Sequence, residues 1–278
     1  MNKILFAVLV ISNLVALPGL AQDRWQLTAF GGVMNYNGEL NSAFRVKNSK
    51  PSFGLGVQYK LTDFWAVQAN LTYGKLNAHD SNNVANTAHR NLHFSNNIFE
   101  VNTVAVLHFR DLYYKMWTPY VFVGVAYFHH EPYTYYAGQK VKLRPLSTEG
   151  QGLANYPDRK PYSPHQIAIP FGGGVKFRLS DKVHLAYEVN LRKLFTDYID
   201  DVSTRYVNPA DLLAERNQLA VDLSYRGGEI PGGNPAYPAL NTIRGSEKTK
   251  DWYYNHGIKL FIGLGDGGRN NYLRCPKF

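Results

Sequence analysis

The chain has almost no cysteine. Its 278 residues contain one Cys, at position 275. A single cysteine excludes an internal disulfide framework, and an unpaired cysteine in an oxidising compartment indicates a bond to another chain. Cys275 is therefore the candidate for an intermolecular disulfide.

Charged residues are also few, at 18% of the sequence, and the basic ones do not cluster. The net charge is +9, but Lys and Arg are spread along the chain without forming a basic patch. A nucleic-acid partner is therefore not expected. Long apolar runs are missing as well. After the N-terminus, no segment reaches the roughly 20 apolar residues of a transmembrane helix.

The N-terminus has the pattern of a secretory signal peptide. Lys3 makes it basic, an apolar run extends from Ile4 to Leu17, and Gly19-Leu20-Ala21 provides small residues for cleavage. We expect a signal peptide at 1–21 and an exported mature chain that begins near Gln22. No Cys follows the cleavage site, so a lipoprotein is not expected.

Tyr and Gly are abundant, and apolar residues alternate with polar or small ones over many segments. In 52–61, Phe53, Leu55 and Val57 share one face, while Gly54, Gly56 and Gln58 share the other. Such period-two alternation predicts β-strands. Eight strands are predicted, over 25–36, 52–61, 64–74, 98–109, 119–128, 166–179, 182–192 and 252–264.

The connections between these strands alternate between long and short. Thr62-Asp63 and Ser180-Asp181 are tight turns, and 110–118 is short, whereas 75–97, 129–165 and 193–251 are long. This alternation is typical of an eight-stranded antiparallel transmembrane up-and-down β-barrel with long external loops. The alternative, a soluble barrel of lipocalin type, would bury its apolar face inside.

Aromatic residues lie near many predicted strand ends, as the girdles of a membrane barrel require. They are Trp25, Tyr59, Trp65, Tyr73, Trp117, Tyr120, Trp252 and Tyr254. Eight strands leave a lumen with room for side chains and little else. Buried charges are expected to pair, so we predict a closed polar network rather than a pore. The inward candidates are Glu100, His108, Lys176, Arg178, His184, Glu188, Arg192 and Lys259.

Three carboxylates, Asp197, Asp200 and Asp201, begin the longest loop. Their D-x-x-D-D spacing lacks the glycine and later glutamate of an EF-hand, so no metal site is assigned, although a looser calcium site stays open. We expect these acids to cap turns and to pair with Arg or Lys of neighbouring loops. Asn208-Pro209 predicts the start of a short helix over 210–216.

No segment carries a catalytic or cofactor-binding motif. His129 and His130 are adjacent, but a strand points them to opposite sides. Ser163 and His165 are close in sequence, without an acid or oxyanion signature to support a catalytic role. The TEGQG tract at 148–152 lacks the lysine of a phosphate-binding loop. We therefore predict no catalytic residue and no cofactor.

Seven segments together resemble the PorG-type outer-membrane proteins of the type IX secretion and gliding apparatus of the Bacteroidota. They are NYNGEL (35–40), RNLHF (90–94), PYVFVGVAYF (119–128), PLSTEGQG (145–152), IPFGGGVKF (169–177), EVNLRKLFTDYIDDVSTRY (188–206) and CPKF (275–278). The resemblance covers nearly all of the mature chain, and TDYIDDVS is its most specific piece.

The resemblance implies a non-enzymatic outer-membrane protein that anchors a periplasmic ring, built from a lipoprotein and its partner subunit. It makes Asp197, Tyr198, Asp200, Asp201, Val202 and Ser203 family-signature loop residues, and Cys275 the family's terminal cysteine. The expected organisation is a barrel over 22–264, surrounded by outer-membrane lipid, and a periplasmic tail over 265–278. The short turns and the tail would form the docking face.

Two other functions stay open from the sequence. One is a lipid-modifying enzyme that uses Ser163, His165 and an acid at the membrane edge. The other is an adhesin or ligand-binding barrel that acts through its external loops.

Overall fold

The computed structural model describes residues 24–40, 49–80, 87–112, 114–246 and 250–265. The predicted signal peptide at 1–21, Cys275 and all but one residue of the predicted tail lie outside these ranges. No helix among the described residues is long and apolar enough to cross a membrane.

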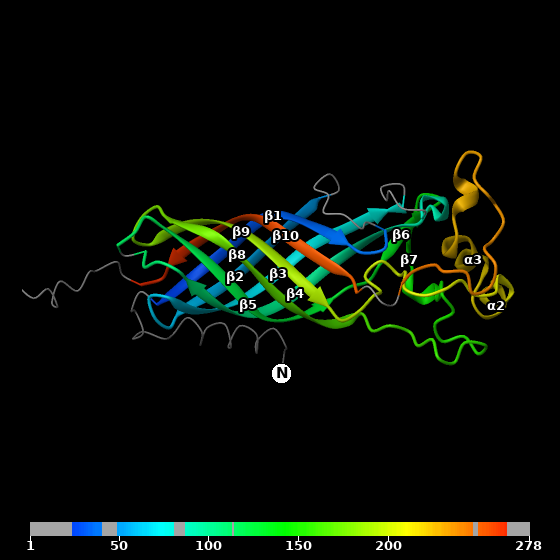
Figure 1. Cartoon of the computed structure of the whole chain (residues 1–278), viewed down its shortest axis with the longest axis horizontal. Helices are drawn as coiled ribbons and strands as arrows, with labels where there is room; N and C mark the ends of the chain where they lie inside the picture. The colour runs from blue at the N-terminus through cyan, green and yellow to red at the C-terminus, as the bar shows by residue number, and fades with distance from the viewer. Residues whose placement is uncertain (1–23, 41–48, 81–86, 113, 247–249, 266–278) are drawn as a thin grey trace, which may run out of the picture.

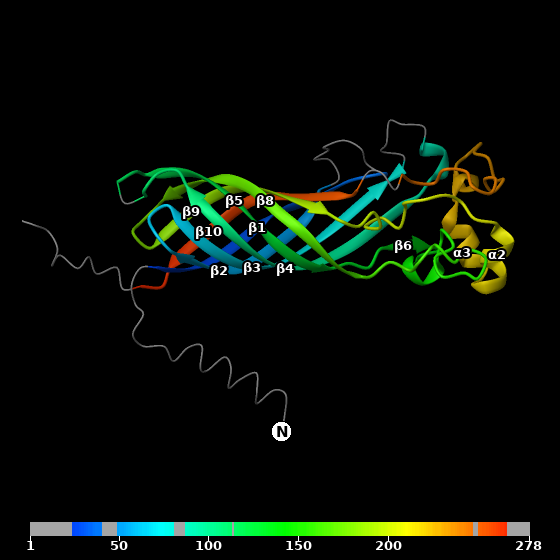
Figure 2. The same cartoon turned by 60° about the horizontal axis from the view of Figure 1, so that its bottom comes forward.

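Eight antiparallel strands form a closed barrel, as the sequence predicts (Figures 1 and 2). Every barrel strand pairs with two neighbours, and the last strand closes the barrel on the first, for example at Ala29↔Leu260. The strands are β1 (Trp25–Asn37), β2 (Lys50–Lys60), β3 (Trp65–His79), β4 (His93–His108), β5 (Trp117–His129), β8 (His165–Arg178), β9 (Val183–Leu194) and β10 (Trp252–Gly263).

Strands β3 and β4 are longer than predicted. Their pairing continues from Lys75↔Asn97 to His79↔His93, so part of the expected loop over 75–97 is strand. The alternation persists there, because Leu76 is buried inside while its neighbours Lys75 and Asn77 are partly exposed. Only the outward face changes, from apolar to polar. The sequence prediction ended these strands where the outward apolar face ends, which was wrong.

The long connections fold into an ordered layer over one end of the barrel, which we call the external cap (residues 130–164 and 195–246). Figures 1 and 2 show its elements gathered beyond the same barrel end. It contains the hairpin β6 (Tyr133–Tyr136) and β7 (Gln139–Lys142), helices α2 (Pro209–Glu215) and α3 (Gln218–Ser224), and short 3₁₀ turns at Arg144–Leu146 and Gly227–Glu229. A further 3₁₀ turn, Ala88–Arg90, lies between β3 and β4.

Helix α2 confirms the helix predicted after Asn208-Pro209. The Asn208 side chain accepts a hydrogen bond from the Ala210 N–H at 3.0 Å, and Pro209 occupies the first helical position. Helix α3 was not predicted.

The outer surface of the barrel is apolar. Leu55, Val125 and Ile167 are 67%, 64% and 58% exposed, and they lie on the face opposite the polar lumen residues. A soluble barrel would have the reverse arrangement, whereas a membrane barrel exposes such a band to lipid. Because the apolar face lies outside, the lipocalin-like alternative is wrong.

Aromatic residues flank this band, with two corrections. Tyr254, expected in the girdle, is only 7% exposed. Trp25, Trp65 and Trp117 are 38%, 48% and 39% exposed near the short turns, and Tyr73 is 51% exposed toward the external cap. Tyr120, expected in the girdle, instead points inward and is 3% exposed. Its hydroxyl donates to Glu188 at 2.8 Å, which satisfies a carboxylate in the lumen.

Glu100 and Arg192 form the central ion pair of the lumen. Both side chains are fully buried, and the Arg192 guanidinium donates to the two Glu100 oxygens at 2.9 and 3.0 Å. The Tyr253 hydroxyl and the Asn102 amide also donate to this carboxylate. Arg192 reaches Asn255 at 3.0 Å. A buried pair of this kind is tolerated because further hydrogen bonds to Tyr253, Asn102 and Asn255 help to satisfy both charged groups.

A second pair lies beside the first in the lumen. The Lys259 ammonium lies 3.0 and 3.1 Å from the two oxygens of Glu188. Two cavities of about 10 Å³ lie among these side chains, lined in common by Asn70, Asn102, Glu188, Asn190 and Lys259. Each has room for about one water molecule. The lumen beside these pairs is thus filled by side chains.

Lys176 and Arg178 lie nearer the short turns. Lys176 is 1% exposed, and its ammonium donates to Gln26 at 3.1 Å and sits 3.6 Å from the centre of the Phe261 ring. Arg178, predicted in the same network, lies instead at the mouth of the barrel, where its guanidinium contacts the Met116 sulfur at 3.8 Å. It is the last residue of β8, so it lies beyond the buried part of the lumen.

We predict that Glu100→Ala lowers the free energy of unfolding of the barrel by ~3–5 kcal/mol, because Arg192 is left buried without its carboxylate. Replacing both residues by Met costs much less, because no uncompensated charge remains. Urea titration of the barrel in lipid vesicles measures both. The control is Lys142→Ala, which breaks the exposed Lys142–Glu131 pair and changes stability by about 0–1 kcal/mol. Equal effects of Glu100→Ala and the control would contradict the role given to the buried pair.

Candidate functional site

The signature segment 197–203 is buried within the external cap. Asp197, Asp200, Asp201 and Ser203 are each 1–2% exposed. The segment begins shortly after the end of β9 at Leu194, so its position is fixed by that strand. The structure thus brings the predicted loop residues together at the barrel end with the long connections.

The three aspartates bond mostly to hydroxyl and backbone groups. Asp200 accepts from the Tyr36 hydroxyl at 2.6 Å and from the Val202 N–H at 3.0 Å. Asp197 accepts from the Ser203 hydroxyl at 2.8 Å.

Asp201 accepts from the Thr148 and Tyr162 hydroxyls at 2.6 and 2.7 Å. The Tyr162 ring stacks on Tyr198, with centroids 4.7 Å apart. The expected capping of turns occurs at Asp200. The carboxylates of these aspartates bond to hydroxyls and N–H groups, whereas the sequence predicted pairing with Arg or Lys.

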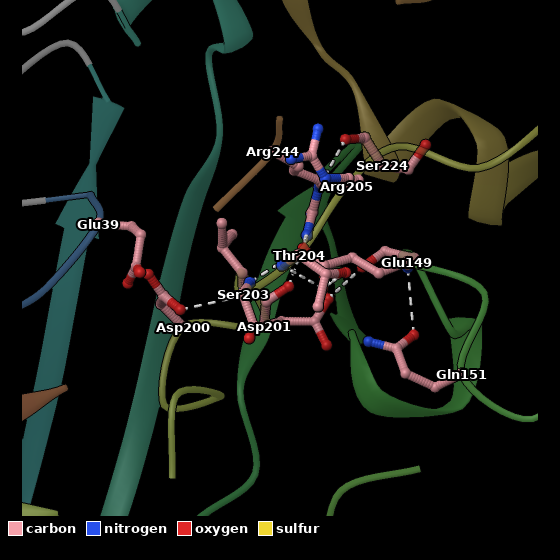
Figure 3. A network of polar contacts seen from close by, with 12 residues as sticks. Glu39, Glu149, Gln151, Asp200, Asp201, Ser203, Thr204, Arg205, Ser224 and Arg244 are labelled. Atoms are coloured by element: carbon pink, nitrogen blue, oxygen red, sulfur yellow. Dashed lines mark hydrogen bonds and ion pairs between the residues drawn. The ribbon is translucent and has the colours of Figure 1, made fainter. Parts of the chain in front are cut away.

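The central ion pair of the cap uses residues that the sequence prediction missed, Glu149 and Arg244. Their side chains are 0% and 2% exposed, and they meet at 2.8 Å. Glu149 also accepts from the Ser203 and Thr204 N–H groups at 2.9 and 3.0 Å. Arg244 donates to the main-chain oxygens of Asp201 and Ser224. Figure 3 shows these groups converging from separate loops.

This convergence joins two segments of the sequence signature. Glu149 belongs to PLSTEGQG, and Ser203 belongs to TDYIDDVS. The two segments lie 54 residues apart at this hydrogen bond. Both segments belong to the resemblance to PorG-type proteins, and this was the signal in the sequence that relates them. The pairing itself could not be predicted, because nothing local in either segment indicates the other as its partner.

A group of acids lies beside the signature. Glu39, Asp197 and Asp251 have carboxylate oxygens within 4.8 Å of one another. The Tyr36 hydroxyl links Asp251 to Asp200, at 2.8 and 2.6 Å. These oxygens are of the kind that Ca²⁺ prefers, but three carboxylates fall short of its usual six to eight ligands. Of the three aspartates considered for a calcium site, Asp197 is the one that belongs to this group.

Burial raises the pKa values of several of these carboxyls. The pKa of Glu39 is raised from 4.5 to about 7, by burial and then by the nearby Asp197. The pKa of Asp201 is raised from 3.8 to about 6, again by burial. Burial also raises the pKa values of Asp200 and Asp251 well above their ordinary range, helped by the negative charges around them. The cap thus holds carboxyls that bind protons tightly.

The structure places the adjacent histidines and Ser163 where the barrel wall meets the external cap. His129 and His130 point to opposite sides of the wall, as predicted, and His130 is fully buried against the Tyr162 ring. Burial lowers the pKa of His130 to about 4. The Ser163 hydroxyl bonds to the main-chain oxygen and N–H of His165, at 3.0 and 3.1 Å. The Ser163 side chain therefore stabilises the turn that precedes β8.

Three comparisons with known proteins were made. Residues 2–212 match a family model described as "Domain of unknown function (DUF6089)". No curated protein matches the chain. Several solved structures are similar to this chain at TM-scores below 0.5.

One of these structures is Neisserial surface protein A (NspA), at 9% identity and a TM-score of 0.42, covering 86% of this chain and 97% of that chain. Another is the outer membrane protein OprG from Pseudomonas aeruginosa, at 11% identity and a TM-score of 0.42, covering 87% and 97%. A third is Ail, the attachment invasion locus protein of Yersinia pestis, in complex with the heparin analogue sucrose octasulfate. It has 8% identity and a TM-score of 0.41, covering 86% and 97%.

We predict that Glu149→Ala opens the external cap while the barrel stays folded. The substitution leaves the Arg244 guanidinium buried without its carboxylate and two N–H groups without an acceptor, a loss of ~3–5 kcal/mol. Hydrogen exchange of 197–206 should rise strongly, and exchange of β1–β5 should not change. The control is Glu215→Ala, which removes an exposed bond to the Ala154 N–H. Unchanged exchange in Glu149→Ala would contradict the central role of this pair.

The raised pKa values predict that the cap is more stable at lower pH. A carboxyl with a raised pKa holds its proton more tightly in the folded cap, so the stability of the cap falls as pH rises from the ordinary 4.5 toward about 7. Limited proteolysis of the external cap in detergent micelles should be slower at about pH 5 than at about pH 8. Asp200→Asn removes one of the titrating charges and should flatten this profile. A cap that is cleaved faster at the lower pH would contradict the sign.

Proposed function

The chain belongs to the DUF6089 family, and we propose that it is a non-enzymatic outer-membrane component of the type IX secretion and gliding machinery. The proposal rests on the seven segments that resemble PorG-type proteins. The contact between Glu149 and Ser203 supports it, because two of those segments form one structural unit. In this function the barrel anchors a periplasmic ring that is built from a lipoprotein and its partner subunit.

The filled and capped lumen is the observation that carries this function. The Glu100–Arg192 and Glu188–Lys259 pairs occupy the interior, and two water-sized cavities lie beside them. Conduction of solutes is a poor fit to such an interior. A barrel that does not conduct can still act as a fixed point in the membrane, with the short turns at 61–64, 110–116 and 179–182 available to a partner.

The proposed location is the outer membrane, with the external cap facing the medium and the short turns facing the periplasm. The apolar outer band and the signal-like N-terminus support this orientation, which is the usual one for bacterial barrels. Anchoring then takes place on the periplasmic side. Cys275, outside the described residues, is proposed to form a disulfide with the ring lipoprotein.

An enzymatic function has little support at the residues that suggested it. The Ser163 hydroxyl bonds to backbone groups, and among the described residues no hydrogen bond joins it to an imidazole. A nucleophile would need a base within reach. We therefore propose no catalytic role for Ser163 or His165.

External ligand binding is the second candidate, and one observation favours it. The external cap is ordered and exposes Leu213, Leu240 and Ile243, at 51%, 54% and 64%. Apolar side chains on an ordered surface are available to a ligand or host molecule. Leu213→Ser with Ile243→Ser would reduce such binding and leave ring anchoring intact.

The anchoring function predicts a co-purifying periplasmic lipoprotein. The full chain, carrying an affinity tag, is purified from gently solubilised envelopes and compared on non-reducing and reducing gels. We expect a high-mass band that resolves into this chain and the lipoprotein only after reduction. Cys275→Ser should abolish that band, because the disulfide has no other cysteine in this chain to use.

The control is Ser163→Ala, which alters the external side and should leave the band unchanged. A lipoprotein that co-purifies equally with Cys275→Ser retains the anchoring function and removes its covalent part. A preparation without any periplasmic partner, from both versions of the chain, would overturn the proposed function.

A further inference from the structure

Two pairs of histidines lie directly across adjacent strands of the barrel. His129 at the end of β5 is paired with His165 at the start of β8, and His79 of β3 is paired with His93 of β4. Both pairs are at the external end of the wall. Opposed side chains on one face of a sheet are its closest neighbours, so each pair brings two imidazoles together.

The backbone pattern places His129 and His165 in a close type of pair. The His130 N–H donates to the Pro164 oxygen at 2.9 Å, so 130 and 164 form a hydrogen-bonded pair. Hydrogen-bonded and non-hydrogen-bonded pairs alternate in an antiparallel ladder, so 129 and 165 are the non-hydrogen-bonded type, whose side chains are nearer. Their ring centroids are 4.7 Å apart.

The imidazoles of this pair have nitrogens available for a ligand. The Nδ1 atom of His129 is buried and has no hydrogen-bond partner in the described part of the chain. His165 uses its main-chain groups to bond Ser163, and its ring stacks on Tyr127 with centroids 5.7 Å apart. Stacking fixes the plane of the ring and leaves the ring nitrogens free of that contact.

The second pair shows what would block such a site. Asp80 N–H donates to the Leu92 oxygen at 2.8 Å, so His79 and His93 are also the non-hydrogen-bonded type. Here the Arg226 guanidinium lies 3.1 and 3.2 Å from the two ring nitrogens of His93. A fixed positive charge at that distance repels a metal cation. No such contact reaches His129 or His165 from the described residues.

We propose that His129 and His165 form a two-histidine site for a divalent transition-metal ion, Zn²⁺ or Cu²⁺, with water completing the coordination. Neutral imidazole is a preferred ligand for both ions. Zn–N bonds of about 2.0–2.1 Å require the two donor nitrogens to lie roughly 3.3 Å apart at a tetrahedral angle. The ring centroids lie 4.7 Å apart, so the two imidazoles are close enough for the proposal to place one ion between them.

The site joins the two strands whose pairing is interrupted. The β5–β8 register includes Val123↔Phe171 and then Ala126↔Ala168, and the two pairs between them are missing. Pro170 lies in this gap and has no N–H to donate. A metal ion bound by His129 and His165 would add a link between the strands on the external side of this gap, at the end of the paired stretch that begins with Ala126↔Ala168. This inference concerns the external face and is independent of ring anchoring.

Zn²⁺ binding to the full chain tests the site. The protein carries a tag without histidine and the Cys275→Ser substitution, so that neither tag nor thiol binds the ion. Isothermal titration with Zn²⁺ should give one saturable site. His129→Ala and His165→Ala should each weaken it by about tenfold or more, equivalent to ~1.4 kcal/mol per factor of ten. Zn²⁺ should also raise the unfolding temperature of the parent, and not that of the variants.

Two control variants separate this site from the other candidates. His93→Ala alters the pair that faces Arg226, and Asp251→Asn alters the acidic group. Neither should affect the Zn²⁺ isotherm or the thermal shift. Binding that survives His129→Ala or His165→Ala would overturn the proposal. Binding that is lost only in Asp251→Asn would overturn it as well and would assign the ion to the acids.

Discussion

Closure of the hydrogen-bonded ladder is the constraint on which the rest of the molecule depends. A sheet in lipid has no water to bond its edge groups, so an open edge is not tolerated. Pairing of β10 with β1 removes that edge and fixes the number of strands at eight. The size of the lumen follows from the strand number. In a narrow lumen each buried charge needs a close polar partner: Glu100 pairs with Arg192, and the Lys176 ammonium donates to the neutral Gln26 side chain.

The external cap, like the lumen, is stabilised by a buried ion pair. The lumen and the cap each contain a buried carboxylate–guanidinium pair, and in each the carboxylate accepts further hydrogen bonds from neighbouring groups. Such pairs are costly unless fully bonded, and they favour one arrangement of the chain over others only when every partner is present. The molecule is therefore polar inside, apolar around its middle, and densely bonded above.

The barrel could be predicted because its signal is local and repeated. Alternation along each strand and alternation of long and short connections depend on neighbouring residues, and both survive in the structure. The ends of β3 and β4 were wrong because their outward face turns polar where the strands leave the apolar band. Tyr120 and Arg178 were misplaced for related reasons: an aromatic residue can face inward to bond Glu188, and a terminal residue can leave the lumen.

The organisation of the external cap could not be predicted in this way. Asp197, Asp200 and Asp201 drew attention because they cluster in sequence, yet the pair at the centre is Glu149 with Arg244, which are 95 residues apart. No period or spacing links such positions. The resemblance to PorG-type proteins includes both PLSTEGQG and TDYIDDVS. It relates the two segments but does not predict that they are in contact.

The distance along the chain between these partners has a consequence for assembly. Glu149, Ser203 and Arg244 come from different parts of the chain. Glu149 precedes β8, whereas Ser203 and Arg244 follow β9 in the connection that leads to β10. Contacts between distant segments form late, since the loops that separate them must first be closed. The cap can therefore assemble only when all of its segments are already on the same side of the membrane. Its completion would mark a chain whose insertion is finished, and a stalled chain would leave Glu149 and Arg244 open to solvent and to proteases.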